Sequence, residues 1–89
     1  MVAPRQVKLL YFAWVREKVG RAEETVDLGE GLETISDLIA WIKTRGPEYA
    51  AAFERADVIR AAIDQRHVRP SASIRDAREI AFFPPVTGG

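Results

Sequence analysis

The hydrophobic pattern of the chain changes its period between Thr34 and Gly46. Apolar residues there recur at helical spacing and form the single stripe of an amphipathic helix: Ile35, Leu38, Ile39 and Ile42. Thr34 is a good N-cap, and Asp37 follows it as an imperfect capping box. Gly46 and Pro47 are typical of a helix end, so we expect the helix to stop through a C-terminal glycine at Gly46. Whatever the rest of the chain forms has to cover this stripe.

Before this helix, the residues from Val7 to Phe12 have the pattern of a strand. Lys8 identifies the face that meets water, and the opposite face is expected in the core with Val7, Leu9 and Tyr11. Leu10 and Phe12 then share the outward face with Lys8. A domain that acts alone seldom exposes such apolar surface, so this face is a candidate for docking a partner.

The segment from Glu24 to Leu28 alternates polar and apolar residues and is expected to pair with the first strand as a hairpin. Between the two strands, Ala13 to Gly20 has the character of a short helix, and Gly20 suits a left-handed C-terminal cap. After the main helix, the alanine-rich segment from Glu48 to Arg55 is expected to form a further short helix. The first half of the chain therefore predicts two strands and up to three helices.

The second half returns to strands. One is expected over Val58 to Ile63, with a short return strand at His67 to Arg69 and a polar loop from Ser71 to Arg78. The last strand is expected over Arg78 to Phe83. Alternation predicts that the inward residues of the first and last of these strands are Ile59, Ala61, Ile63, Ile80 and Phe82, and that the outward ones are Arg60, Ala62, Asp64, Ala81 and Phe83.

The predicted order is two strands, one main helix and three strands. This order is an α+β arrangement, compatible with a β-grasp in which a small mixed sheet packs on one helix. We assign residues 1–83 to this domain and residues 84–89 to an extended C-terminal tail.

The composition excludes several classes of function. The chain of 89 residues has 13 basic and 13 acidic side chains, so no net field favours nucleic acid or a membrane surface. It has no cysteine and one histidine, and these residues provide neither a disulfide framework nor a metal cluster. We therefore expect no bound metal or cofactor, and we expect a cytoplasmic location. The sequence also offers no phosphate-binding glycine loop and no catalytic triad.

The tail has an unusual composition for the end of a compact domain. Pro84 and Pro85 favour an extended path, so the segment through Val86 and Thr87 can project roughly 20 Å. The two residues after it, Gly88 and Gly89, have no side chains and fit a channel too narrow for a Cβ atom. We therefore expect the carboxylate of Gly89 to be the reacting group and the tail to insert into another protein.

The ending Phe82-Phe83-Pro84-Pro85-Val86-Thr87-Gly88-Gly89 resembles the C-terminus of the molybdopterin synthase small subunits, a family of ubiquitin-like β-grasp sulfur carriers. The run Leu9 to Ala13 followed by Val15 to Glu17 is similar to the family's first strand and helix, so the resemblance extends over nearly the whole chain. The chain departs from the family pattern at Ile63 to Gln65 and at Asp76 to Arg78, which affects turns and not the tail.

The resemblance implies a mechanism. A ubiquitin-activating-type adenylyltransferase uses ATP to adenylate Gly89, and a sulfur donor replaces AMP to leave a C-terminal thiocarboxylate. The tail then enters the large synthase subunit, where its sulfur attacks the cyclic pyranopterin monophosphate, and the family suggests a heterotetramer with two small subunits at opposite ends of a large-subunit dimer. On this interpretation the carrier has no catalytic apparatus of its own. We expect its docking surface to be Leu10, Phe12 and Phe83, with His67 at the edge.

Two alternatives remain open from the sequence. One is a carrier for thiamin thiazole synthesis or tRNA thiolation, or a protein-conjugating ubiquitin-like modifier. The other is a ubiquitin-like interaction module whose glycine tail is incidental, and whose mass would not change with ATP, activating enzyme and sulfide. Trp14 and Trp41 are expected to be packing residues.

Overall fold

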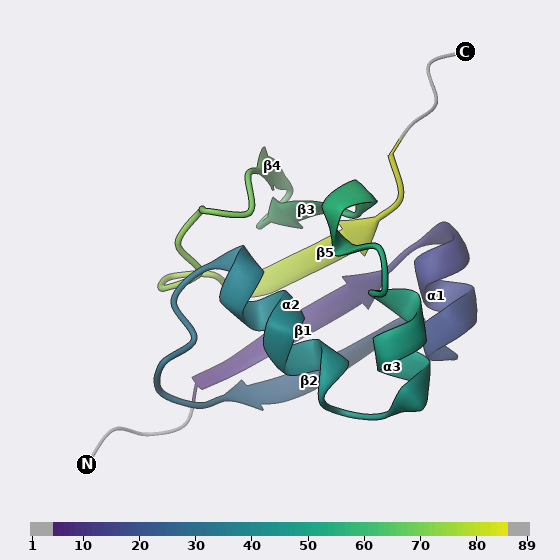
Figure 1. Cartoon of the computed structure of the whole chain (residues 1–89). Coiled ribbons are helices and arrows are strands. Elements are labelled where there is room, and N and C mark those ends of the chain that lie inside the picture. Colours follow the sequence, from purple (N-terminus) through teal and green to yellow (C-terminus); the bar gives the residue numbers. More distant parts are fainter. Residues whose placement is uncertain (1–4, 86–89) are drawn as a thin grey trace.

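The structure, a computed structural model, describes residues 5–85. It contains one mixed sheet with the strand order β2-β1-β5-β3-β4 (Figure 1). β1 and β5 run parallel, and the other neighbouring strands are antiparallel. The predicted α+β order is confirmed. Along the chain the elements are β1 (Arg5–Tyr11), α1 (Ala13–Val19), β2 (Glu23–Leu28), α2 (Ile35–Lys43), α3 (Pro47–Ala52), the 3-10 helix η1 (Ala56–Val58), β3 (Arg60–Ile63), β4 (Arg66–Val68) and β5 (Glu79–Phe83).

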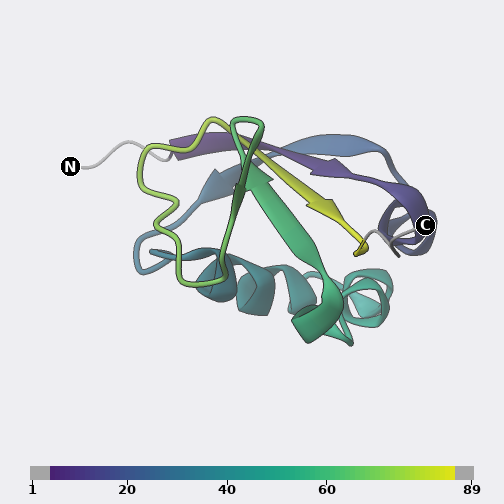
Figure 2. The same cartoon turned by 90° about the horizontal axis from the view of Figure 1, so that it is seen from above.

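The helices lie on one side of the sheet. Figure 2 shows α2 and α3 along one face, and no helix of residues 5–85 covers the other. The stripe predicted for the main helix is buried against the sheet, as are the inward residues of β1 and β5: Ile35, Leu38, Ile39, Ile42, Val7, Leu9, Tyr11, Ile80 and Phe82. Burying this apolar surface supplies the main driving force for the fold. Trp14 and Trp41 pack at the edge of the core, as predicted.

The hairpin of β1 and β2 contains α1 in its connection, as predicted. Gly20 has φ of 90° and its N–H donates to the carbonyl of Arg16 at 2.9 Å. A left-handed residue at this point is easiest for glycine, because a Cβ atom makes that conformation unfavourable. The glycine therefore ends α1 and turns the chain into β2.

The start of α2 is better formed than the sequence suggested, and its end differs from the prediction. Both halves of the capping box between Thr34 and Asp37 are present. The helix ends at Lys43, so the predicted glycine stop at Gly46 is wrong. Gly46 is instead extended and precedes Pro47, the first residue of α3. Proline disfavours a helical conformation in the residue before it but suits the first turn of a new helix, which explains the shift.

The strands of the second half confirm the predicted faces with small changes in their bounds. β3 begins at Arg60, because η1 takes up the start of the predicted strand. Ala62 points to the open face but is only 7% exposed, because Ala81 and His67 flank it in the ladder. The loop from 71 to 78 is not simply polar, since Ile74 and Ala77 within it are buried in the core.

Candidate functional site

A strip of residues crosses the open face of the sheet. The strand register places Leu10 beside Ala81, Ala81 beside Ala62, and Ala62 beside His67. Residues in register point to the same side of a sheet, so these side chains form one continuous row from β1 to β4. Leu10 and Ala81 are half-buried and His67 is exposed. The row is thus apolar along most of its length and ends in an imidazole.

Phe12 and Phe83 extend this surface toward the end of β5. The N–H of Phe12 donates to the carbonyl of Phe82 at 3.0 Å, which continues the pairing of β1 and β5 one residue past Tyr11. Phe12 is 48% exposed, more than any other large hydrophobic side chain among residues 5–85. Phe83 is half-buried, and its ring centroid lies 5.1 Å from that of His67. The structure therefore brings together all four residues expected on the docking face.

The backbone holds Phe12 in place. Its extended conformation makes it the N-cap residue of α1, and its carbonyl accepts from the N–H of Val15 at 3.1 Å. Ala13 follows with φ of 52°, a left-handed conformation that disfavours a residue with a Cβ atom by roughly 1 kcal/mol. This sharp turn redirects the chain into α1 and leaves about half of the Phe12 side chain exposed.

The base of the tail is anchored by an aromatic cluster. The Phe82 ring lies 6.3 Å from Tyr11, nearly parallel to it, and 5.2 Å from Phe53, edge to face. All three rings are fully buried. Pro84 and Pro85 follow β5 and are half-buried. The remaining residues expected to insert or react lie outside the described residues: Val86, Thr87, Gly88 and Gly89.

The described part of the chain contains no group of three or more His, Cys, Asp or Glu side chains placed to hold a metal ion. Within residues 5–85, no helix has the length and hydropathy needed to cross a membrane.

The sequence profile of the ThiS family matches residues 9–89, almost the whole chain including the tail. The chain belongs to the ThiS family. Two curated relatives are each called "Molybdopterin synthase sulfur carrier subunit". The protein from Chlamydomonas reinhardtii is 37% identical and the match covers 94% of this chain and 99% of the relative. The protein from Escherichia coli (strain K12) is 35% identical, and the match covers 93% of this chain and 99% of the relative.

Solved structures agree with the ThiS-family fold. A putative molybdopterin converting factor, subunit 1, from Pyrococcus furiosus is 31% identical and superposes with a TM-score of 0.70, covering 91% of this chain and 98% of the other. Small archaeal modifier protein 1 from Haloferax volcanii superposes with a TM-score of 0.68 at 21% identity. The match covers 91% of this chain and 98% of the other. These neighbours confirm the predicted ubiquitin-like β-grasp.

Beneath the sheet, this ThiS-family chain contains a polar cluster that the sequence analysis missed. The Glu24 carboxylate accepts hydrogen bonds from the hydroxyls of Tyr11 and Tyr49, both at 2.8 Å, and from the guanidinium of Arg45 at 2.9 and 3.0 Å. The Glu24 side chain is 8% exposed and that of Arg45 is 25% exposed. The Arg45 guanidinium also lies 4.6 Å from the centre of the Tyr49 ring. The cluster joins β1, β2, α3 and the segment before α3.

The cluster controls the ionisation of its members. Burial disfavours the charge on Glu24, but the hydrogen bonds from Arg45, Tyr11 and Tyr49 outweigh it and hold the pKa of Glu24 below its usual value. Burial and the bond to Glu24 raise the pKa of Tyr11 and of Tyr49. Glu24 is in phase with the inward residues Val26 and Leu28, so a charge on the buried face of this strand was the available signal. Its pairing with Arg45 requires knowledge of the tertiary fold.

Proposed function

We propose that this protein is the sulfur carrier subunit of a molybdopterin synthase. The observation that carries the proposal is the match to curated relatives of that name along 93–94% of this chain and 99% of theirs. The ThiS family match, the Gly88-Gly89 ending and the apolar open face of the sheet support a sulfur carrier, without distinguishing one pathway from another.

The reacting group in this proposal is the carboxylate of Gly89. A carboxylate is a poor electrophile, so an adenylyltransferase of the ubiquitin-activating type first converts it to an acyl-adenylate with ATP and releases pyrophosphate. A donor that supplies sulfide then forms the C–S bond as the bond to AMP breaks, and the products are a C-terminal thiocarboxylate and AMP. The carrier needs no acid-base group for these steps, because its partners supply them.

In the next step the thiocarboxylate sulfur forms a C–S bond to a carbon of the cyclic pyranopterin monophosphate precursor bound by the large subunit, and the C–O bond at that carbon breaks to release its oxygen substituent. Hydrolysis of the resulting acyl link leaves the sulfur on the pterin and returns Gly89 to a carboxylate. The product is a dithiolene with two sulfur atoms, so two carriers discharge for each pterin. We propose a heterotetramer with a carrier at each end of a large-subunit dimer.

The composition of the tail suits insertion into a narrow channel. The rings of Pro84 and Pro85 restrict the backbone, so the tail loses less conformational entropy on entering a partner than a flexible tail would. Val86 and Thr87 supply side chains that contact the walls of the channel, and the absence of side chains at Gly88 and Gly89 lets the reacting carbon approach closely.

The open face of the sheet is the proposed docking surface for the large subunit. The backbone pairing of β1 and β5 continues to Phe12, whose side chain is 48% exposed, next to the end of β5 at Phe83, and Leu10 continues the apolar area. Polar groups surround this area, including Lys8, whose ammonium lies 2.9 Å from the Glu23 carboxylate. An aromatic centre within a polar rim is the usual anatomy of a specific protein interface. The same face lies next to the start of the tail, so docking directs the tail into the partner.

The partner identifies the pathway. We expect the purified protein to co-elute in gel filtration with the large subunit of a molybdopterin synthase and to elute separately from a thiazole synthase. Co-elution with the thiazole synthase alone would assign the chain to the thiamin pathway and overturn the proposal. A protein that binds neither and gains no sulfur would be an interaction module.

A further inference from the structure

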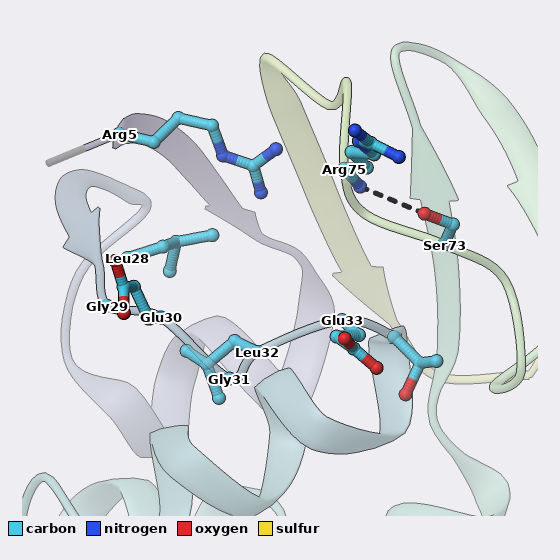
Figure 3. A pocket seen from close by; sticks show the side chains of 10 residues that line it. Arg5, Leu28, Gly29, Glu30, Gly31, Leu32, Glu33, Ser73 and Arg75 are labelled. Atoms are coloured by element: carbon cyan, nitrogen blue, oxygen red, sulfur yellow. Dashed lines mark hydrogen bonds between the residues drawn. The ribbon is translucent and has the colours of Figure 1, made fainter. Parts of the chain in front are cut away.

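A cavity of about 850 Å³ lies at the end of the sheet where β1 begins, in the part of the chain that the structure describes. The start of β1, the β2–α2 loop and the loop before β5 enclose it (Figure 3). The tail leaves from the opposite end, because β1 and β5 are parallel and the tail follows the last residue of β5 (Figure 1). The cavity therefore lies at the other end of β1 and β5 from Phe12 and Phe83 of the docking face and from Pro84 and Pro85, where the tail begins.

One wall of the cavity is basic. Figure 3 shows Arg5 extending over the cavity from the start of β1 and Arg75 standing beside it on the loop before β5. Neither guanidinium has a carboxylate within ion-pair distance among residues 5–85. Ser73 lines the same side, and its Oγ accepts from the N–H of Arg75 at 3.1 Å, which leaves the hydroxyl proton able to donate. Two guanidinium groups and a hydroxyl match the acceptor oxygens of a phosphate.

The start of α2 also borders the cavity, but its N–H groups already have partners. The N–H of Ile35 donates to the carbonyl of Ala72 at 3.1 Å, that of Ser36 to Pro70 at 2.9 Å, and that of Asp37 to the Thr34 hydroxyl at 3.1 Å. The helix terminus is consequently not the group that holds an anion in this cavity, and the side chains of the basic wall are the remaining cationic donors.

The opposite wall and the floor have different chemistry. The β2–α2 loop contributes Glu30 and Glu33 along the side facing the arginines (Figure 3). Carboxylates pair well with hydroxyl donors such as those of a ribose. Leu28 lies between Arg5 and the β2–α2 loop, Leu32 lies on that loop, and both provide apolar surface for a flat ring (Figure 3). A ligand that fits all three parts has an anion at one end, hydroxyl groups at the other side and a planar apolar body.

The cavity is preformed. The N–H of Ile74 donates to the carbonyl of Glu33 at 3.0 Å, and Thr34 pairs with Ser73 in an isolated bridge, so the two loops that form the walls are tied together. The Ile74 side chain is fully buried in the core. A ligand entering the cavity then orders little additional chain, which favours binding. The volume is within the range of small-molecule sites, roughly 300–1,000 Å³.

We propose that this cavity binds a nucleoside monophosphate. The phosphate lies between Arg5 and Arg75, the ribose hydroxyls donate to the acidic wall, and the base covers Leu28 and Leu32. This inference does not depend on the proposed sulfur-carrier function, and it assigns no chemical step to the cavity.

The test is a titration of the full-length, ¹⁵N-labelled protein with AMP, followed by NMR. We expect AMP to shift the amide resonances of Gly29, Gly31 and Ser73 in a saturable manner. Inorganic phosphate and adenosine should each bind at least about tenfold more weakly than AMP. Arg5→Gln and Arg75→Gln should each weaken AMP binding about tenfold, as expected for a lost charge-assisted contact. Arg16→Gln, at an exposed arginine on α1, is the matched control and should bind as the unmodified protein does.

Four results would each overturn the proposal. The first is no shift of the amide resonances at millimolar AMP, and the second is an unchanged affinity for AMP in either arginine variant. The third is inorganic phosphate binding as tightly as AMP, which would mean an adventitious ion only. The fourth is ribose 5-phosphate binding as tightly as AMP, which would leave the apolar floor without a role. The assay contains no activating enzyme or synthase partner, so its failure leaves the sulfur-carrier proposal unaffected, and the reverse is also true.

Discussion

Arg45 donates two parallel hydrogen bonds to the carboxylate of Glu24, at 2.9 and 3.0 Å, from the segment between α2 and α3 to the edge strand β2. The two residues are 21 positions apart, and the hydroxyls of Tyr11 and Tyr49 complete the environment of the same carboxylate. Tyr11 also stacks on Phe82 at the base of the tail. The pair thus connects the edge of the sheet to the helical layer and to the strand that directs the tail.

Replacing Glu24 by glutamine should destabilise the protein by about 2 kcal/mol at pH 7. Removing one partner of a fully buried ion pair costs about 3–5 kcal/mol, and the value here is lower because Arg45 keeps a quarter of its side chain in solvent. Urea unfolding measures the difference. Glu23→Gln is the matched control, since its ion pair with Lys8 is exposed and should contribute less than about 1 kcal/mol.

The effect of Glu24→Gln should depend on pH. The pKa of Glu24 is lower in the folded protein than its ordinary value of 4.5, so its contribution to stability is complete above that value and is lost as the pH falls through the folded pKa. The difference in unfolding free energy between the two proteins should therefore be constant from pH 7 to about 5 and shrink in more acidic solution. A difference that stays the same down to pH 3 would contradict the assignment.

Phe12→Asp should weaken binding to the large subunit at least about tenfold, because it places a charge at the centre of the proposed apolar interface. The stability of the isolated carrier should change little, since the ring is 48% exposed. Calorimetric titration with the large subunit measures the affinity. Ala40→Asp, at an exposed position of α2 on the other side of the sheet, introduces the same charge and should leave the affinity unchanged.

Phe53→Ala should destabilise the protein by about 3–5 kcal/mol, because it leaves a cavity beside Tyr11 and Phe82. Conservative replacement by leucine should cost less. Thermal unfolding of both variants provides the measurement, and an alanine variant as stable as the unmodified protein would mean that the aromatic cluster does not anchor β5.

Much of the fold follows from the sequence because its patterns are local. Lys8 alone fixes the phase of β1 and so predicts that Tyr11 is buried and Phe12 exposed, and both predictions are confirmed. Gly46 shows the limit of such reasoning. Glycine followed by proline is compatible with the end of one helix or the start of the next, and in the structure Gly46 precedes Pro47 at the start of α3.

The candidate functional surface was predictable where it depends on alternation and unpredictable where it depends on tertiary pairing. The positions of Leu10, Phe12 and Phe83 on one face follow from period-two patterns. The partner of Glu24 and the cavity between Arg5 and Arg75 arise from segments far apart in the sequence, and no periodicity links them. Alternation places Ala62 on the correct face, but its burial depends on neighbours in two other strands.

The intact mass of the protein tests the proposed conversion of the Gly89 carboxylate to a thiocarboxylate. The purified protein is incubated with the activating enzyme, ATP and a sulfur donor and then analysed by mass spectrometry. We predict a gain of about 16 Da, the exchange of one oxygen for sulfur, in the unmodified protein. Gly88→Val and deletion of Gly89 should abolish the gain while the fold is retained. An unchanged mass for the unmodified protein, or the same gain in the truncated one, would contradict the account.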